Sequence, residues 1–135
     1  MNDCLFCKII NKEIPNYTVY EDENTLAFLD IHPCSKGHTV VISKKHFVDL
    51  SEMSVSDWQD VSRGLAGAFA RVKEVLNPDG LNLGINNGKA AGQAVAHAHW
   101  HLIPRWQGDG GGNMHSIIRK GDGVDVKEVA GLFTK

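Results

Sequence analysis

Histidines alternate with apolar residues in the segment 96–104 of the chain, which reads His97-Ala98-His99-Trp100-His101-Leu102 at its centre. Residues two apart in a strand point to the same face. The pattern therefore predicts a strand over 96–104 with the three histidines on one face and Ala98, Trp100 and Leu102 facing the core. A histidine-bearing solvent face of an edge strand is the alternative interpretation.

Strand geometry limits what the three histidines can bind together. A strand rises about 3.3 Å per residue, which puts the first and third histidines about 13 Å apart. Zinc–nitrogen bonds are only about 2.1 Å long, so one ion cannot reach both ends of an extended strand. At least one histidine must have another role. Neutral imidazole is a nucleophile and proton carrier near pH 7, and its cation binds phosphate.

Composition narrows the class of protein. The 135 residues fit one domain, and 42% hydrophobic residues are enough for a core. The 14 lysines and arginines against 16 acids argue against a nucleic-acid partner. No apolar run approaches the roughly 20 residues of a membrane span, so no membrane partner is expected. An odd cysteine count and no visible secretory signal favour the cytoplasm, with thiols that are reduced or bound to metal.

The remaining segments predict a sheet with few helices. A short helical pattern covers 4–11, and strand patterns cover 17–21, 25–31, 38–42 and 81–86. Asn87-Gly88 is a tight-turn signal. About five strands with one long helix and short connections predict an α+β fold with an antiparallel sheet.

The long helix has its own signals. Ser56 and Gln59 have the spacing of a capping box at its start, and 77–80 (Asn-Pro-Asp-Gly) ends it. Apolar residues spaced by three or four predict one buried stripe: Trp58, Val61, Leu65, Phe69, Val72 and Leu76. Beyond Trp106, the run Gly108–Gly112 predicts a flexible loop that leads into an ill-defined tail.

The stretch 97–103 resembles the histidine triad pattern, His-φ-His-φ-His-φ-φ, of the HIT family of nucleotide hydrolases and transferases. Further segments resemble family landmarks in the family's order: 4–10, 26–31, 44–46 and 92–93. The resemblance covers 3–105 and is strongest to the Hint-type proteins, in their bacterial zinc-containing form. It implies a single HIT domain over 1–135, with 106–135 as a glycine-rich loop and tail, and a homodimer whose sheets join.

The resemblance implies catalysis by two members of the triad. His99 would attack the α-phosphorus of a nucleotide and form a covalent nucleotidyl-histidine, from which water releases the nucleoside monophosphate. His101 would bind the phosphate oxygens and offset charge in the transition state. The carbonyl of His97 would hold the His99 ring in the right tautomer. The expected enzyme is a purine nucleoside phosphoramidase. A dinucleoside polyphosphate hydrolase, a nucleotide-binding adaptor with little catalysis and a zinc protein without a nucleotide role are the alternatives.

The resemblance also implies a purine nucleotide site. Asp30 would accept hydrogen bonds from both ribose hydroxyls, although by itself it reads as a strand-end carboxylate. The expected slot around the base comprises Phe6, Ile9, Phe28, Ile31 and Val40, for which core packing is an equally good explanation. The expected groups near the phosphates are His38, Asn86, Gly92 and Gln93, although the glycines of 88–93 alone predict only a hairpin loop. Such apolar walls would discriminate little between bases.

Two positions bear on the leaving group and on metal. Ala94 stands where Hint-type proteins often have a serine that helps the leaving group depart, so leaving-group preference stays open. The spacing of Cys4-x-x-Cys7 is that of metal ligands, but it is also that of a redox pair. The resemblance implies a structural zinc held by Cys4, Cys7, His46 and His97. Cys34, His32 and His115 read as ordinary residues without a site role.

Overall fold

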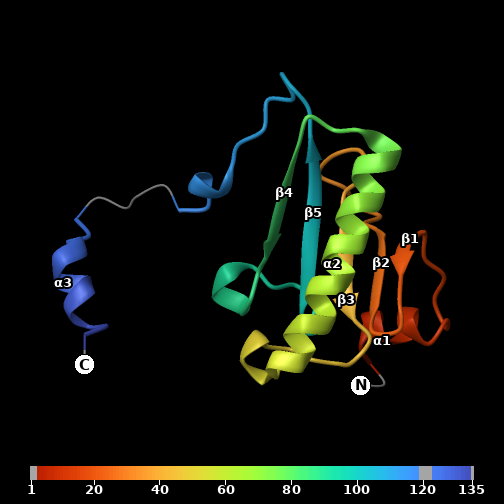
Figure 1. The fold of residues 1–135 in the computed structure, drawn as a ribbon, viewed down its shortest axis with the longest axis horizontal. Coiled ribbons are helices and arrows are strands. Elements are labelled where there is room, and N and C mark those ends of the chain that lie inside the picture. Colours follow the sequence, from red (N-terminus) through yellow and green to blue (C-terminus); the bar gives the residue numbers. More distant parts are fainter. Residues whose placement is uncertain (1–2, 119–122, 135) are drawn as a thin grey trace.

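The computed structural model describes residues 3–118 and 123–134 and contains one five-stranded antiparallel sheet of order β1-β2-β3-β5-β4. The strands are β1 (Thr18–Glu21), β2 (Thr25–Leu29), β3 (Thr39–Ser43), β4 (Gly80–Ile85) and β5 (His99–Arg105). The helices are α1 (Leu5–Ile10), α2 (Val55–Leu76) and α3 (Val126–Gly131), with single 3-10 turns at Leu50–Glu52, Lys89–Ala91 and Met114–Ser116. The predicted α+β architecture is confirmed (Figure 1).

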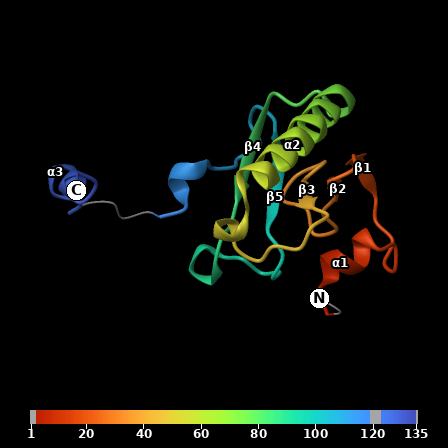
Figure 2. The ribbon, with the colours of Figure 1, turned by 60° about the horizontal axis from the view of Figure 1, so that its bottom comes forward.

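Two helices cover opposite faces of the sheet, α2 one and α1 the other (Figures 1 and 2). The α2 side is packed with Ala27, Val41, Trp100 and Leu102, whereas the α1 side holds Leu26, Phe28, Val40 and Ile42. Alternate residues of one strand thus enter different cores, as the pleat requires. The predicted division of β5 is confirmed, because Trp100 and Leu102 lie on the α2 side.

Helix α2 begins two residues earlier than the predicted capping box. Ser54 is the N-cap: its Oγ accepts from the N–H of Asp57 at 3.1 Å, and Asp57 Oδ2 accepts from the N–H of Ser54 at 2.9 Å. The prediction of Ser56 and Gln59 was therefore wrong, since both lie within the helix. The predicted end is confirmed by Asn77, which caps the helix in the left-handed conformation with φ of 45°.

The buried stripe of α2 differs from the predicted one. Its fully buried residues are Val61, Gly64, Ala68 and Val72, whereas Trp58 and Phe69 are 38% and 40% exposed. A Cβ on Gly64 would lie 2.2 Å from the Thr25 methyl, so the helix approaches the sheet more closely than a large residue would allow. Small residues therefore occupy the contact line, and the two aromatic residues lie on the flank.

Strand β5 begins at His99, so His97 lies in the turn before it rather than inside the strand. The predicted tight turn at Asn87-Gly88 was also wrong. Residues 86–98 form a longer loop that includes the 3-10 turn Lys89–Ala91, with Gly88 and Gly92 at φ of 92° and 98°. Glycine adopts such positive φ values without the steric cost of a side chain.

Arg105 organises the glycine-rich segment that follows β5. Its guanidinium donates to both carboxylate oxygens of Asp109 at 2.8 Å, to Asn82 Oδ1 at 2.8 Å and to the carbonyl of Gly112. The predicted flexible loop is therefore held by specific hydrogen bonds, and the tail contains α3, which lies apart from the sheet (Figure 1). In the ranges 3–118 and 123–134, no helix combines the length and apolarity of a membrane span.

Candidate active site

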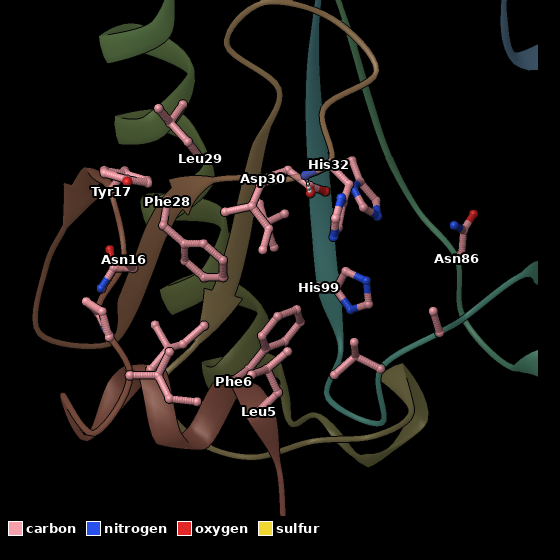
Figure 3. Close-up of a pocket in the computed structure, with 18 of the residues that line it drawn as sticks. Leu5, Phe6, Asn16, Tyr17, Phe28, Leu29, Asp30, His32, Asn86 and His99 are labelled. Carbon is pink, nitrogen blue, oxygen red and sulfur yellow. Dashed lines mark hydrogen bonds between the residues drawn. The ribbon is translucent and has the colours of Figure 1, made fainter.

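A cavity of about 500 Å³ opens on the α1 side of the sheet, between α1, the end of β2, β5 and the loop after β4 (Figure 3). The five predicted slot residues all line it: Phe6, Ile9, Phe28, Ile31 and Val40. The rings of Phe6 and Phe28 meet edge to face at 5.6 Å. Except for Ile31, which is 74% exposed at the rim, these residues also belong to the buried core, so both interpretations of them hold.

His99 lines this cavity and is 6% exposed. Its Nδ1 lies 2.8 Å from the carbonyl oxygen of His97, the contact that the resemblance implied. A carbonyl can only accept, so Nδ1 carries the proton and Nε2 carries the free lone pair. The Phe6 ring and the imidazole pack edge to face, with 5.1 Å between their centroids. In its neutral form, His99 therefore presents the Nε2 lone pair in a fixed orientation.

His101 lines the cavity beside His99, and His38 lies behind it. Nε2 of His38 is 2.9 Å from Nδ1 of His101. Burial, together with the neighbouring His99 and His38, lowers the pKa of His101 to about 4, and burial also lowers the pKa of His38. Both rings are neutral at pH 7. His38 is thus a support for His101 rather than part of the cavity wall.

Asp30 follows β2 at the end of the cavity that also holds His32 (Figure 3). Its Oδ1 accepts from the N–H of His32 at 2.8 Å, and its Oδ2 lies 3.7 Å from Nε2 of His38. The backbone N–H of Asp30 donates to the carbonyl of His38 at 2.9 Å. A half-buried carboxylate with lone pairs to spare is an acceptor for ligand hydroxyls.

Three residues between β4 and β5 were predicted to lie near the phosphates: Asn86, Gly92 and Gln93. Asn86 and Gly92 line the cavity, but Gln93 does not. The Gln93 amide accepts from the N–H of Gly88 at 2.8 Å and donates to the carbonyls of Val48 and Val95 at 3.0 Å each. Its polar atoms are therefore engaged in bracing the loop.

Ala94, the position expected to bear on the leaving group, also lines the cavity, and several lining residues were not predicted: Leu5, Ile14, Pro15, Asn16, Tyr17, Leu29, His32 and Val95. Of the polar ones, Asn16 and Tyr17 come from the connection between α1 and β1. His32 was expected to have no site role. The only signal that the sequence offered for these polar residues is their position in short connections next to predicted site residues.

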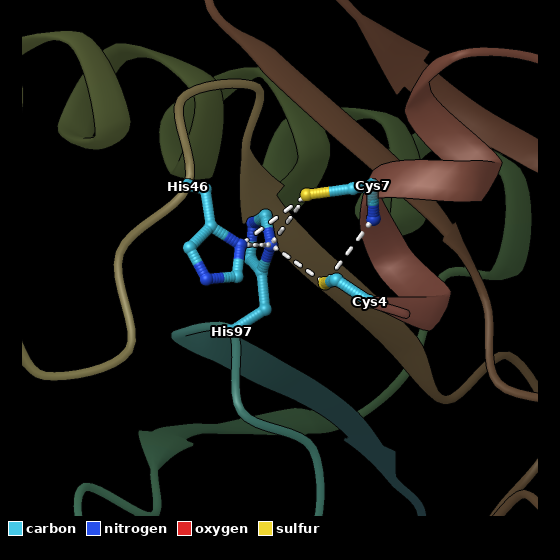
Figure 4. Close-up of side chains that lie close together, drawn as sticks. All are labelled: Cys4, Cys7, His46 and His97. Atoms are coloured by element: carbon cyan, nitrogen blue, oxygen red, sulfur yellow. Dashed lines mark hydrogen bonds between the residues drawn. The ribbon is translucent and has the colours of Figure 1, made fainter. Parts of the chain in front are cut away.

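Cys4, Cys7, His46 and His97 form a second cluster (Figure 4). Nδ1 of His97 lies 3.4 Å from Cys4 Sγ, 3.7 Å from Cys7 Sγ and 3.1 Å from Nδ1 of His46. Cys7 Sγ lies 3.2 Å from Nδ1 of His46. Four such ligands around a tetrahedral zinc would be about 3.4 to 3.8 Å apart, given Zn–N and Zn–S bonds of about 2.1 and 2.3 Å.

The imidazole of His97 is in the form that binds a metal ion, whereas the Cys7 thiol must lose its proton to bind one. Nε2 of His97 lies 2.9 Å from the carbonyl of Ser43 and donates to it, which leaves the Nδ1 lone pair facing the sulfurs. Burial lowers the pKa of His97 to about 4, so the ring is neutral. Burial and the neighbouring Cys4 raise the pKa of Cys7 to about 11, an environment that only a nearby cation would make favourable for a thiolate.

Comparison with known proteins agrees with this geometry. The HIT domain family model matches residues 11–108. A HIT-like protein of Methanocaldococcus jannaschii is 46% identical over 128 residues, which cover 93% of this chain and 95% of that protein. The adenylylsulfatase HINT3 of Arabidopsis thaliana is 40% identical over 80% of this chain, which spans 55% of that protein.

A solved structure bears on the metal cluster as well as on the fold. The zinc-bound histidine triad family protein of Mycobacterium smegmatis is 42% identical and superposes with a TM-score of 0.71, over 81% of this chain and 79% of that one. The family includes enzymes such as the plant adenylylsulfatase and metal-bound members such as the mycobacterial protein. The matched range, the identities and the histidine geometry together establish that this chain belongs to the HIT domain family.

Proposed function

We propose that the chain is a nucleotide hydrolase that forms a covalent nucleotidyl-histidine on His99. The observation that carries this proposal is the hydrogen bond from Nδ1 of His99 to the carbonyl of His97, because in the neutral ring it places the free lone pair on Nε2, next to a cavity of nucleotide size. Nε2 attacks the α-phosphorus, the phosphorus–nitrogen bond to His99 forms, and the bond to the leaving group breaks. The leaving group departs with the electron pair and takes up a proton from water.

Water completes the reaction. It attacks the phosphorus, the bond to Nε2 breaks, and the nucleoside monophosphate is released with the water oxygen. His101 has its Nδ1 turned to His38, so its Nε2–H is the group available to a phosphate oxygen. A neutral donor that is already in place stabilises the charge of the transition state without reorganisation.

The substrate is a purine nucleotide with a leaving group on its α-phosphate. The aromatic and aliphatic slot around Phe6 and Phe28 takes the base, and the Asp30 carboxylate accepts from the ribose hydroxyls. Asn86 and Gly92 lie at the opposite end from Tyr17, on the phosphate side. Apolar walls supply stacking area and few base-specific hydrogen bonds.

A phosphoramidate is our first candidate for the leaving-group side of the substrate. The name of the plant relative, adenylylsulfatase, supports adenylyl sulfate as a second candidate, and dinucleoside polyphosphates are a third. Ala94 lines the cavity and places no hydroxyl there. The Ala94→Ser variant is therefore expected to change the order of rates among these leaving groups.

Zinc is the metal that the second cluster fits. Two thiols and two imidazoles within 4.8 Å of one another are the donor set of a structural zinc site, and the mycobacterial relative is zinc-bound. We propose that Cys4, Cys7, His46 and His97 hold it. All four tetrahedral positions are then filled by protein, so zinc would supply a crosslink and no open coordination position.

We propose a homodimer that pairs through β4, one of the two outer strands of the sheet. Strand β4 is an outer strand, and Leu83 on it is 44% exposed. Unpaired strand edges invite pairing with another chain. Two β4 strands side by side would join the sheets of two copies.

Acid quench of a brief reaction with adenosine 5′-phosphoramidate, followed by mass spectrometry, tests the proposal. We expect an AMP adduct on His99 in the wild type and none in His99→Ala, with turnover reduced about 10³-fold or more in the variant. His115→Ala, in the exposed tail, is the matched control and should keep the adduct. Tight AMP binding without an adduct or turnover would identify a nucleotide-binding adaptor instead.

A further inference from the structure

His97 belongs to both the metal cluster and the active site. Its ring faces Cys4, Cys7 and His46 through Nδ1, while its backbone carbonyl accepts from Nδ1 of His99 at 2.8 Å. The side chain is 0% exposed. An interaction that fixes the ring of His97 therefore also fixes its backbone carbonyl, which sets the tautomer of His99.

Phe6 makes a second connection between the two sites. It lies between Cys4 and Cys7 in sequence, on α1, and its ring contacts the rings of His97 and His99 edge to face at 5.9 and 5.1 Å. The same ring lines the cavity. The position of α1 thus determines both the shape of the proposed base slot and the packing on His99.

The cluster joins three separate segments of the chain. Cys4 is the N-cap of α1 and Cys7 lies within it, His46 follows β3, and His97 precedes β5. Without a metal, the His97 ring is held by the hydrogen bond from Nε2 to the carbonyl of Ser43 and by contacts of Nδ1 with the thiols and with His46. The six-residue α1 then depends on the apolar contacts of Phe6 and Ile9. Short helices in water are marginal without tertiary contacts.

We propose that metal occupancy of the cluster and nucleotide binding in the cavity stabilise each other, with His97 and Phe6 as the positioning residues that couple them. This inference rests on the proposed function. When zinc is bound to the cluster, it constrains the Nδ1 side of the His97 ring and the N-terminal end of α1. The carbonyl of His97 and the ring of Phe6 are then held where His99 and the nucleotide require them.

Thermodynamic linkage gives the sharpest test, because it uses the wild-type chain. If zinc tightens AMP binding by some factor, AMP must tighten zinc binding by the same factor. The dissociation constant of AMP is measured by calorimetry with and without zinc, and that of zinc by chelator competition with and without saturating AMP. We expect equal changes of about tenfold in the two, within the 5- to 150-fold range of coupled sites.

The state of His99 supplies a readout independent of activity. Nitrogen-15 spectra of the histidine rings should show one His99 tautomer, protonated on Nδ1, in the zinc-bound chain. In the zinc-free chain the two nitrogen shifts should move toward each other as the tautomers exchange. Circular dichroism of the zinc-free chain should retain the α2 and sheet signal, since the core between them excludes the cluster.

Phe6→Leu tests the second connection and keeps an apolar side chain. It should retain one zinc per chain and reduce the linkage between zinc and AMP, whereas Cys34→Ser, outside the cluster, should leave the linkage unchanged. A zinc affinity that AMP changes by less than twofold, with unchanged His99 spectra, would overturn the coupling while leaving the nucleotide site intact. Global unfolding without zinc would also overturn it, and absence of AMP binding to the zinc-bound chain would overturn the proposed function as well.

Discussion

Nε2 of His38 lies 2.9 Å from Nδ1 of His101, and the other nitrogen of His38 accepts from the backbone N–H of Cys34 at 3.0 Å. Because Nδ1 of His38 accepts, the neutral ring carries its proton on Nε2 and donates it to His101. His101 is therefore left with its own proton on Nε2. A backbone N–H thus sets, through two rings, the group that His101 offers to the cavity.

The pKa of His101 predicts how the free energy of unfolding depends on pH. Burial lowers this pKa from the ordinary 6.5 to about 4. Between these values the unfolded chain binds more protons than the folded one, so stability rises with pH in this window and levels off above it. The slope contributed by one histidine is at most about 1.4 kcal/mol per pH unit.

Urea denaturation from pH 4.5 to 8 measures this dependence. His101→Gln should flatten the rise relative to the wild type, and His115→Gln, in the exposed tail, should not. Identical slopes for the wild type and His101→Gln would show that His101 is not the group responsible.

Asp30→Asn should weaken AMP binding about 10- to 100-fold. The carboxylate offers charge-assisted hydrogen bonds to two hydroxyls, and bonds to charged groups contribute about 1.5–3 kcal/mol. Asparagine keeps the size and can still accept from the N–H of His32. Calorimetric titration with 2′,3′-dideoxy-AMP is the control, since that ligand lacks both hydroxyls and should bind the two proteins equally. Equal weakening of both ligands would argue against ribose recognition.

Cys7→Ser should lose zinc and lower the melting temperature by about 10 °C or more. A ligand at about 1,000 times its dissociation constant stabilises the folded state by about 4 kcal/mol, and 1 kcal/mol shifts a domain of this size by a few degrees. Metal analysis and scanning calorimetry measure the two effects. Cys34→Ser is the matched control, because Cys34 is exposed and outside the cluster. A wild-type protein purified without zinc would contradict the prediction.

Gly64→Ala should destabilise the fold by about 1–3 kcal/mol, although alanine favours helices. The added Cβ would lie 2.2 Å from the Thr25 methyl, so α2 must move away from the sheet. Ser62→Ala, on the exposed side of the same helix, should change stability by less than about 0.5 kcal/mol. Urea unfolding of the three proteins compares them, and a stable Gly64→Ala would show that the helix can shift without cost.

Local pattern was sufficient for the elements but not for all their details. The alternation in 97–102 predicted which residues of β5 face α2, because the period of a strand is independent of its neighbours. The length of α2 was predictable for the same reason. The cap was not, since Ser54 competes with Ser56 for the same role. The buried line was not either, since the close approach of the helix to the sheet puts Gly64 on that line, while Trp58 and Phe69 stay partly exposed.

The candidate sites divide in the same way. Residue types and the resemblance named His99, His101, Asp30 and the cluster ligands, but Gln93 was expected near phosphate and instead braces its own loop. His32 was assigned no role and lines the cavity. Neither outcome is encoded in nearby residues, because the direction of a loop side chain depends on what the rest of the chain places beside it.

By itself the sequence determined the strand and helix periods, the histidine face and the presence of zinc-type ligands. Only the tertiary structure decided that Cys4 and His97, 93 positions apart, meet beside Phe6, and that the carbonyl of His97 reaches His99. Periodicity arises from the backbone geometry of a few residues. The meeting of distant residues arises from strand register and helix packing, which the whole chain sets together.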